Sequence, residues 1–223
     1  MKNKYSEEVE KLFSYGDANL VTNWPNYVKE MDLDKKHDDE LIDIISTSDL
    51  SRAISGFTIE DFAPRHAWRA LGQLKIIKAV KPLLKALTET KNEEAFDYQN
   101  ELPKVLTLMG PEVIPELESF LQDEKKDWNF KTVLFKVLVE FAKQKPIYRD
   151  QVIVMFNKLF QKYNGNLIFI SRLLNELFLI NPIEDALIRE IISKDKYDFS
   201  TINQERLMQF VKESKLFGQN GNT

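Results

Sequence analysis

The sequence predicts an all-α protein, an α-α superhelix assembled from antiparallel helical hairpins. Gly and Pro number only 7 and 8 among 223 residues, which disfavours a fold that depends on tight hairpin turns. From about Asp61 onward, apolar residues recur at helical spacing. These helical segments come in pairs, and short polar or Gly/Pro-containing breaks separate the two members of each pair.

The pairs amount to about four predicted hairpins. Their first helices run from Pro64 to Leu74, from Leu102 to Met109, from Phe130 to Phe141 and from Leu167 to Ile180. Their second helices run from Val80 to Leu87, from Val113 to Leu121, from Val152 to Phe160 and from Ile183 to Ile192. Breaks at Gly110-Pro111, Lys145-Pro146 and Asn181-Pro182 end one helix and open the next. The recurrence interval, roughly thirty to forty residues, is typical of HEAT or armadillo-like solenoids.

We expect one domain over residues 1–217. The repeats occupy residues 61–193, between N-terminal capping helices in residues 1–60 and a C-terminal cap in residues 194–217, because both ends of a stacked array need polar covers. Residues 218–223 are rich in Gly and Asn and are expected to form a disordered tail.

The helices of the two caps are shorter and less regular. Ser6 is expected to cap a helix that continues to Phe13, and Asp38 is expected to cap a helix across Leu41–Ile45. On the C-terminal side, a last helix is expected over Gln204–Val211. Residues 88–94 are polar and lack periodicity, so this internal segment is expected to be flexible.

Composition and charge exclude several classes of function. Lys plus Arg number 31 against 35 for Asp plus Glu, and the formal charge of -4 disfavours a nucleic-acid partner. The absence of cysteine rules out disulfides, thiolate zinc sites and a cysteine nucleophile. The chain does not open like a signal peptide, and no stretch approaches the roughly 18 apolar residues of a membrane span. We therefore expect a soluble cytoplasmic protein.

One segment has a recognisable pattern, Ala63-Pro64-Arg65-His66-Ala67-Trp68-Arg69-Ala70-Leu71-Gly72-Gln73-Leu74. It resembles bacterial HEAT-repeat proteins related to the phycobilin-lyase-type HEAT-like repeats, including a group of unknown function. The likeness extends to residues 101–103, 108–115 and 196–200, and covers most of residues 38–207. The resemblance implies the solenoid fold. It implies little about activity, because HEAT arrays serve as scaffolds, as lyase subunits and as nucleic-acid enzymes.

The sequence predicts no catalytic residue, no metal site and no cofactor. The two histidines, His37 and His66, are far apart, and neither has a second ligand at helical spacing. An EF-hand loop that starts at Asp32 would need Gly and Glu where His37 and Asp43 stand, so these acidic residues are better explained as helix caps. Neither a phosphate loop nor a nucleophile elbow is present.

His66, Trp68 and Arg69 are candidate binding residues because they lie in the recognisable segment. Arg69 is suited to bind an anion, and Trp68 is suited to stack on a ligand together with Trp24 and Trp128, as aromatic residues do in HEAT-like alkylpurine DNA glycosylases. The structural alternative is stronger for each of them: a packed helix-surface histidine, a core tryptophan and an arginine in an internal ion pair.

The charge on the second helices describes the predicted concave binding face. The net charge is plus three over residues 77–87, minus four over 111–123, plus two over 146–163 and minus two over 183–193. A continuous phosphate track would carry one sign throughout. An alternating face is better suited to a protein or peptide, because it sets the register of the partner.

These observations favour a non-enzymatic interaction or scaffold module. Lys78, Lys81 and Lys85 share one helix face and are predicted to contact an acidic segment of the partner, next to Glu112 and Glu116 on the following hairpin. The alternative hypothesis is an enzyme or enzyme subunit, either a chromophore-lyase-like factor or an alkylpurine DNA glycosylase-like protein.

Overall fold

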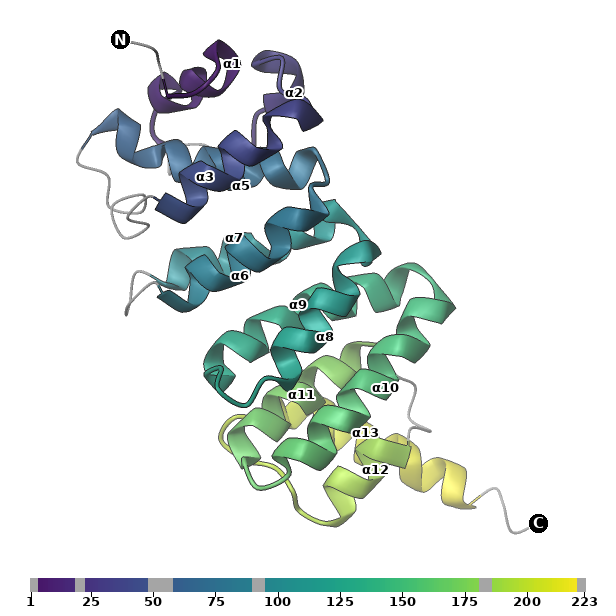
Figure 1. Cartoon of the computed structure of the whole chain (residues 1–223). Helices are drawn as coiled ribbons and strands as arrows, with labels where there is room; N and C mark the ends of the chain where they lie inside the picture. The colour runs from purple at the N-terminus through teal and green to yellow at the C-terminus, as the bar shows by residue number, and fades with distance from the viewer. Residues whose placement is uncertain (1–3, 19–22, 48–57, 90–94, 181–185, 220–223) are drawn as a thin grey trace. The chain divides into compact units, whose positions relative to one another are not determined.

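The computed structural model describes residues 4–18, 23–47, 58–89, 95–180 and 186–219. Within these ranges the chain forms α-helices and short 3-10 turns without any β-strand, so the predicted all-α class is confirmed. The chain folds into two compact units, residues 1–119 and residues 120–223 (Figure 1). No helix in the described ranges is long and apolar enough to cross a membrane.

The first unit has short helices near its N-terminus and longer ones after residue 37. They are α1 (Glu7–Glu10), α2 (Tyr27–Glu30), α3 (Asp38–Thr47), α5 (Ala63–Gln73), α6 (Val80–Glu89), α7 (Ala95–Met109) and the first part of α8 (Ile114–Gln122). 3-10 turns occupy Lys11–Ser14, Lys35–His37, Ile59–Phe62, Ile77–Ala79 and Pro111–Val113. Since α5 packs against α2, α3 and α7, it is the central helix of this unit (Figure 1).

α5 and α7 approach each other closely at Gly72. A Cβ atom added to Gly72 would lie 3.2 Å from both the carbonyl oxygen and a side-chain carbon of Val105 on α7. Glycine is therefore the residue that lets the two backbones meet at this distance. The close approach brings the polar side chains of α5 within reach of α7, where they form the network described below.

The second unit contains longer helices. They are α9 (Trp128–Gln144), α10 (Pro146–Tyr163), α11 (Leu167–Ile180), α12 (Ala186–Ser193) and α13 (Gln204–Gln219). α9 packs against both α10 and α11. At this contact, the ring of Phe135 lies edge-on to Phe156 of α10 and to Phe169 of α11, with centroid distances of 5.2 and 5.4 Å. All three rings are fully buried, so this aromatic cluster forms part of the core of the unit.

Side chains of α9 and α10 satisfy carbonyl groups at the end of α8 and directly after it. Tyr163 donates its hydroxyl to Leu121 O at 3.4 Å, and Lys162 Nζ donates to Gln122 O at 2.6 Å. The buried Lys131 donates to Asp123 O at 2.6 Å, and its ammonium also contacts the Tyr163 hydroxyl. Cations are favourable at a helix C-terminus because of the partial negative charge there. Lys131 is therefore a buried capping residue.

The N-terminal helices differ from the expectation in how they are capped. Asp34 opens the helical segment instead of Asp38, which lies inside a continuous run of helical turns. The carboxylate of Asp34 accepts a backbone N–H of the next turn, and His37 Nδ1 accepts the N–H of Asp34 at 3.0 Å. Ser6 does precede a helix, and α1 continues directly into the 3-10 turn Lys11–Ser14, so the helical run covers Phe13 as predicted. The Ser6 hydroxyl, however, donates to Glu40 at 2.8 Å rather than capping α1.

The remaining helices occur where the sequence predicts them, with shifted ends. α7 begins at Ala95 instead of Leu102, and α6 includes Thr88 and Glu89 of the segment expected to be flexible. α13 extends to Gln219, past the predicted start of the tail. The remaining parts of the predicted flexible segment and tail, residues 90–94 and 220–223, lie outside the described residues, as does the predicted break at Asn181-Pro182.

Candidate functional site

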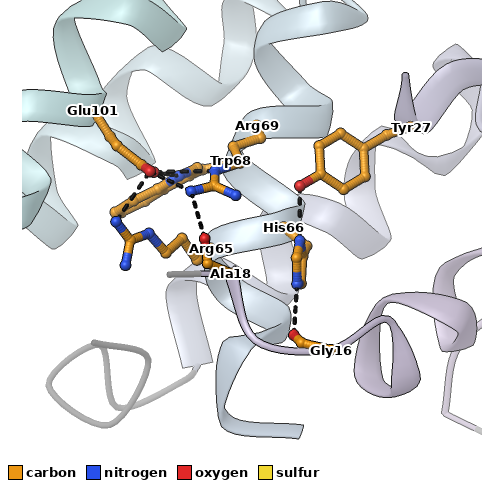
Figure 2. Close-up of polar contacts among 8 residues, drawn as sticks. All are labelled: Gly16, Ala18, Tyr27, Arg65, His66, Trp68, Arg69 and Glu101. Atoms are coloured by element: carbon orange, nitrogen blue, oxygen red, sulfur yellow. Dashed lines mark hydrogen bonds and ion pairs between the residues drawn. The ribbon is translucent and has the colours of Figure 1, made fainter. Parts of the chain in front are cut away.

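Three side chains of α5 converge on one carboxylate of α7 (Figure 2). Arg65, Trp68 and Arg69 are spaced by three and four residues, which places them on one face of α5. Arg65 Nη2 donates to Glu101 Oε1 at 3.0 Å, and Trp68 Nε1 donates to Glu101 Oε2 at 3.0 Å. Arg69 donates to both carboxylate oxygens, through Nη2 and through Nε. All four side chains are buried.

Glu101 is held as a carboxylate by these donors. Burial alone would raise its pKa, but the hydrogen bonds and charges of Arg69 and Arg65 outweigh burial and lower the pKa below its ordinary value. Since both oxygens already accept two hydrogen bonds, Glu101 has little capacity left to accept a proton from a substrate. The network can hold α5 against α7, but its geometry is unsuited to general acid-base chemistry.

His66 forms a second buried chain of hydrogen bonds on α5 (Figure 2). Its Nε2 lies 3.0 Å from the carbonyl oxygen of Gly16, which can only accept, so Nε2 carries the proton. Nδ1 then accepts the hydroxyl of Tyr27 at 2.7 Å. Burial lowers the pKa of His66 and raises the pKa of the Tyr27 hydroxyl, so both groups are neutral near pH 7. Both ring nitrogens are engaged inside the protein.

The same helix binds main-chain groups of the N-terminal segment. Besides Glu101, Arg69 Nη2 donates to the carbonyl oxygen of Ala18 at 3.2 Å, and its guanidinium lies 5.2 Å from the ring centroid of the half-buried Trp24. One turn further along α5, Gln73 Nε2 donates to the carbonyl oxygen of Pro25 at 2.7 Å. The polar side chains of α5 therefore attach Gly16, Ala18 and Pro25 to the rest of the unit through their backbone carbonyl groups.

The burial of the predicted binding residues favours their structural interpretation. His66, Trp68 and Arg69 are 0, 3 and 1% exposed, and each is bonded within the chain. Trp128, the third tryptophan of the proposed stacking set, is half-buried in the second unit, where the Arg172 guanidinium lies 4.9 Å from its ring centroid. A direct contact of these residues with a ligand stays a prediction.

The predicted lysine patch lies on the surface of the first unit, between two groups of acidic residues. Lys78 Nζ lies 2.7 Å from the carboxylates of both Asp38 and Asp39 at the start of α3. Lys81 Nζ lies 3.4 Å from the carboxylate of Glu116 on α8. Lys85 and Glu112 are also exposed. We refer to the whole set as the charged face of unit 1: Asp38, Asp39, Lys78, Lys81, Lys85, Glu112 and Glu116.

The described residues provide no group of three or more His, Asp or Glu side chains that could hold a metal ion. In the acidic run that begins at Asp32, Asp34 accepts the backbone N–H of Lys36 at 2.9 Å. The carboxylate of Asp39 contacts Lys78, and Asp43 accepts the hydroxyl of Tyr5 at 2.7 Å. These carboxylates bond to groups within the first unit.

Sequence reasoning missed the partner of the α5 arginines and one carboxylate in the second unit. Arg65 and Arg69 are one turn apart within a helix that is buried from Ala63 to Gly72, a pattern that indicates a buried counter-ion, but Glu101 lies 32 residues beyond Arg69. Glu176 on α11 is half-buried, and burial raises its pKa. No motif distinguishes it from the other glutamates in the sequence.

Comparison of the chain with family models, with curated proteins and with solved structures finds no match in any of the three.

Proposed function

We propose that this protein is a non-enzymatic interaction module whose helical hairpins stack in the manner of HEAT repeats. Within the first unit, α5 packs against α7, so the first helix of one predicted hairpin packs against the first helix of the next, and α3 of the N-terminal cap packs against α5. Within the second unit, α9 packs against α11 in the same way, and α10 packs against its own partner α9. This order of contacts is typical of stacked hairpins and supports the proposal.

The charged face of unit 1 is the observation that carries the proposal. The face has three rows: acidic side chains at the start of α3, basic side chains in the turn before α6 and along α6, and acidic side chains in the turn before α8 and at its start. The ion pairs of Lys78 and Lys81 join these rows directly, at 2.7 and 3.4 Å. The side chain of Lys81 is 75% exposed and that of Asp39 is 88% exposed, so both are accessible to a partner.

A protein partner fits this face better than a nucleic acid does. An exposed ion pair contributes only about 0 to 1 kcal/mol to the stability of the fold. A partner can therefore replace these pairs with contacts to its own charges at a small cost in free energy. Rows of opposite sign would repel a uniformly charged polyanion over part of its length, whereas they would select the register of a protein segment with complementary charges. The partner of Lys78, Lys81 and Lys85 would be an acidic segment.

The test is capture of partners from the native host with the parent chain and with the Lys78→Glu, Lys81→Glu, Lys85→Glu triple variant. Proteins retained by the parent and lost by the variant, with lysine cross-links at these positions, would support the proposal. The matched control carries the same charge change at Lys29, Lys125 and Lys212, which are exposed and do not belong to the charged face. Unchanged recovery of every protein by the first variant would refute the role of this face.

The enzyme alternative has its own readout. Excision of alkylated bases from DNA, or stable uptake of a linear tetrapyrrole, by the purified parent chain would replace the interaction module as the better account of the protein.

A further inference from the structure

Glu176 is a half-buried carboxylate in the middle of α11 that makes no hydrogen bond or ion pair within the described chain. Burying a charge without a partner is unfavourable, and native proteins normally satisfy such groups. Arg172, one turn earlier on the same helix, does not neutralise it. The Arg172 guanidinium lies over the ring of Trp128 and donates to the Thr132 hydroxyl at 3.1 Å.

Charged groups of α9 lie opposite Glu176, but none of them reaches ion-pair distance. Lys136 and Lys143 favour the ionised carboxylate and Glu140 opposes it. Lys143 Nζ instead contacts Glu140 at 2.9 Å. Burial outweighs the two lysines and raises the pKa of Glu176. No side chain of the described residues donates a hydrogen bond to its carboxylate.

Exposed apolar side chains lie on the same face of α11, on both sides of Glu176. Ile168 and Leu179 are each 41% exposed. Ile168 lies eight residues before Glu176 and Leu179 three residues after it, and both spacings return to the same helical face. With a rise of about 1.5 Å per residue, the two apolar side chains are separated by about 16 Å along the helix.

We propose that the seam between α9 and α11 binds a helical segment of another protein, which places a basic side chain against Glu176 and apolar side chains against Ile168 and Leu179. A basic residue supplies the donor and the charge that Glu176 lacks. Because two helices that pack along each other have the same rise per residue, the partner needs leucine-like residues eleven apart, with arginine or lysine three residues from one of them. The half-buried Trp128 and Arg172 beside this seam are of the residue types enriched at the centre of interfaces.

The probes are two alanine-based helical peptides of about 20 residues, long enough to form a helix in water. Their patterns are Leu-x7-Arg-x2-Leu and the reverse, one for each orientation along α11. At least one is expected to bind the parent chain, and to bind the Glu176→Gln variant and a matched peptide with Glu in place of Arg about tenfold or more weakly. Equal binding to parent and variant, or no binding by either peptide, would overturn the proposal.

A stability measurement separates this role from a structural one. If Glu176 serves a partner, the Glu176→Gln variant melts at the same or a higher temperature than the parent, because a half-buried charge without a donor is removed. A lower melting temperature would show that Glu176 supports the fold, and would refute the proposal. Glu205→Gln, at an exposed position of α13 in the same unit, is the matched control. The lysine triple variant of unit 1 should bind the peptide as tightly as the parent does. The proposal for the seam can therefore be refuted without refuting the proposal for the charged face.

Discussion

Arg69 on α5 and Glu101 on α7 are joined by two hydrogen bonds, one from Nε and one from Nη2, although 32 residues separate them in the chain. Arg69 is 1% exposed and Glu101 is 8% exposed. A second guanidinium, that of Arg65, shares the carboxylate, so this buried cluster holds two positive charges and one negative charge. Loss of Glu101 would remove the carboxylate that both buried arginines share.

Replacement of Glu101 by Gln is therefore expected to destabilise the first unit strongly. Breaking a buried ion pair by removing one partner typically costs about 3 to 5 kcal/mol. Glu112→Gln, at an exposed position of the same unit, should change the free energy of unfolding by less than about 0.5 kcal/mol. Urea melts of both variants measure the difference. A Glu101→Gln variant as stable as the parent would show that the cluster contributes nothing to stability.

The stability of the first unit should fall as pH decreases, in two steps. The folded-state pKa of His66 is lowered, chiefly by burial, so the unfolded chain binds more protons below its own pKa of about 6.5. Stability therefore declines as pH falls from about 6.5 toward the folded value. Glu101, whose folded pKa is also lowered, contributes above the ordinary value of about 4.3, and this contribution is lost as pH falls through its folded pKa.

The first step can be assigned with His66→Gln, which removes the titrating group. This variant should be less stable than the parent at about pH 7.5, because two buried hydrogen bonds are disturbed. Its unfolding free energy should depend less on pH between about 7 and 5 than that of the parent. Parallel pH profiles for the two proteins would mean that other groups cause the decline.

Gly72→Ala is expected to destabilise the protein, although alanine is the better helix former by about 1 kcal/mol. The new methyl group would lie 3.2 Å from the backbone oxygen of Val105, and backbone cannot give way as a side-chain end can. Gly165→Ala is the control, since a Cβ there meets no atom within 4 Å. It should be neutral or stabilising by up to about 1 kcal/mol. In thermal melts, the melting temperature of Gly72→Ala should be lower than that of the parent. The melting temperature of Gly165→Ala should be unchanged or higher.

Leu138→Ala tests the core of the second unit. Leu138 is fully buried on α9, so truncation should cost about 2 to 5 kcal/mol, the usual range for a core leucine. The exposed Lys125→Ala change should cost less than about 0.5 kcal/mol. Denaturant midpoints distinguish these outcomes, and equal midpoints for Leu138→Ala and the parent would contradict the packing of α9.

The helices after residue 61 were predictable because their burial follows the 3.6-residue period. In α9, for example, Leu134, Leu138 and Phe141 return to one face, and all three are fully buried. The N-terminal segment lacks this signal. Leu12, Tyr27 and Met31 are equally buried, but they come from turns and very short helices, where no period can develop.

The candidate site was predictable only in part. Exposure of Lys78, Lys81 and Lys85 follows from their common helix face, whereas their acidic neighbours come from helices that precede and follow α6 in the chain. A single sequence contains no information on such pairings at long separation. The same holds for Glu176. Its raised pKa results from burial, which depends on the surrounding helices and not on the neighbouring residues in the sequence.

The attachment of Gly16 and Ala18 to α5 also constrains the order in which the first unit can form. The carbonyl oxygens of Gly16 and Ala18 bind side chains 50 and 51 residues later, and Arg69 in turn depends on Glu101. The chain loses conformational entropy when it closes loops of this length, before the long-range contacts can stabilise it. This order of events slows folding. On the ribosome, Gly16 and Ala18 emerge well before α5, so their carbonyl oxygens can bind His66 and Arg69 only after α5 has left the exit tunnel. Two residues that are synthesised early thus form these native contacts late.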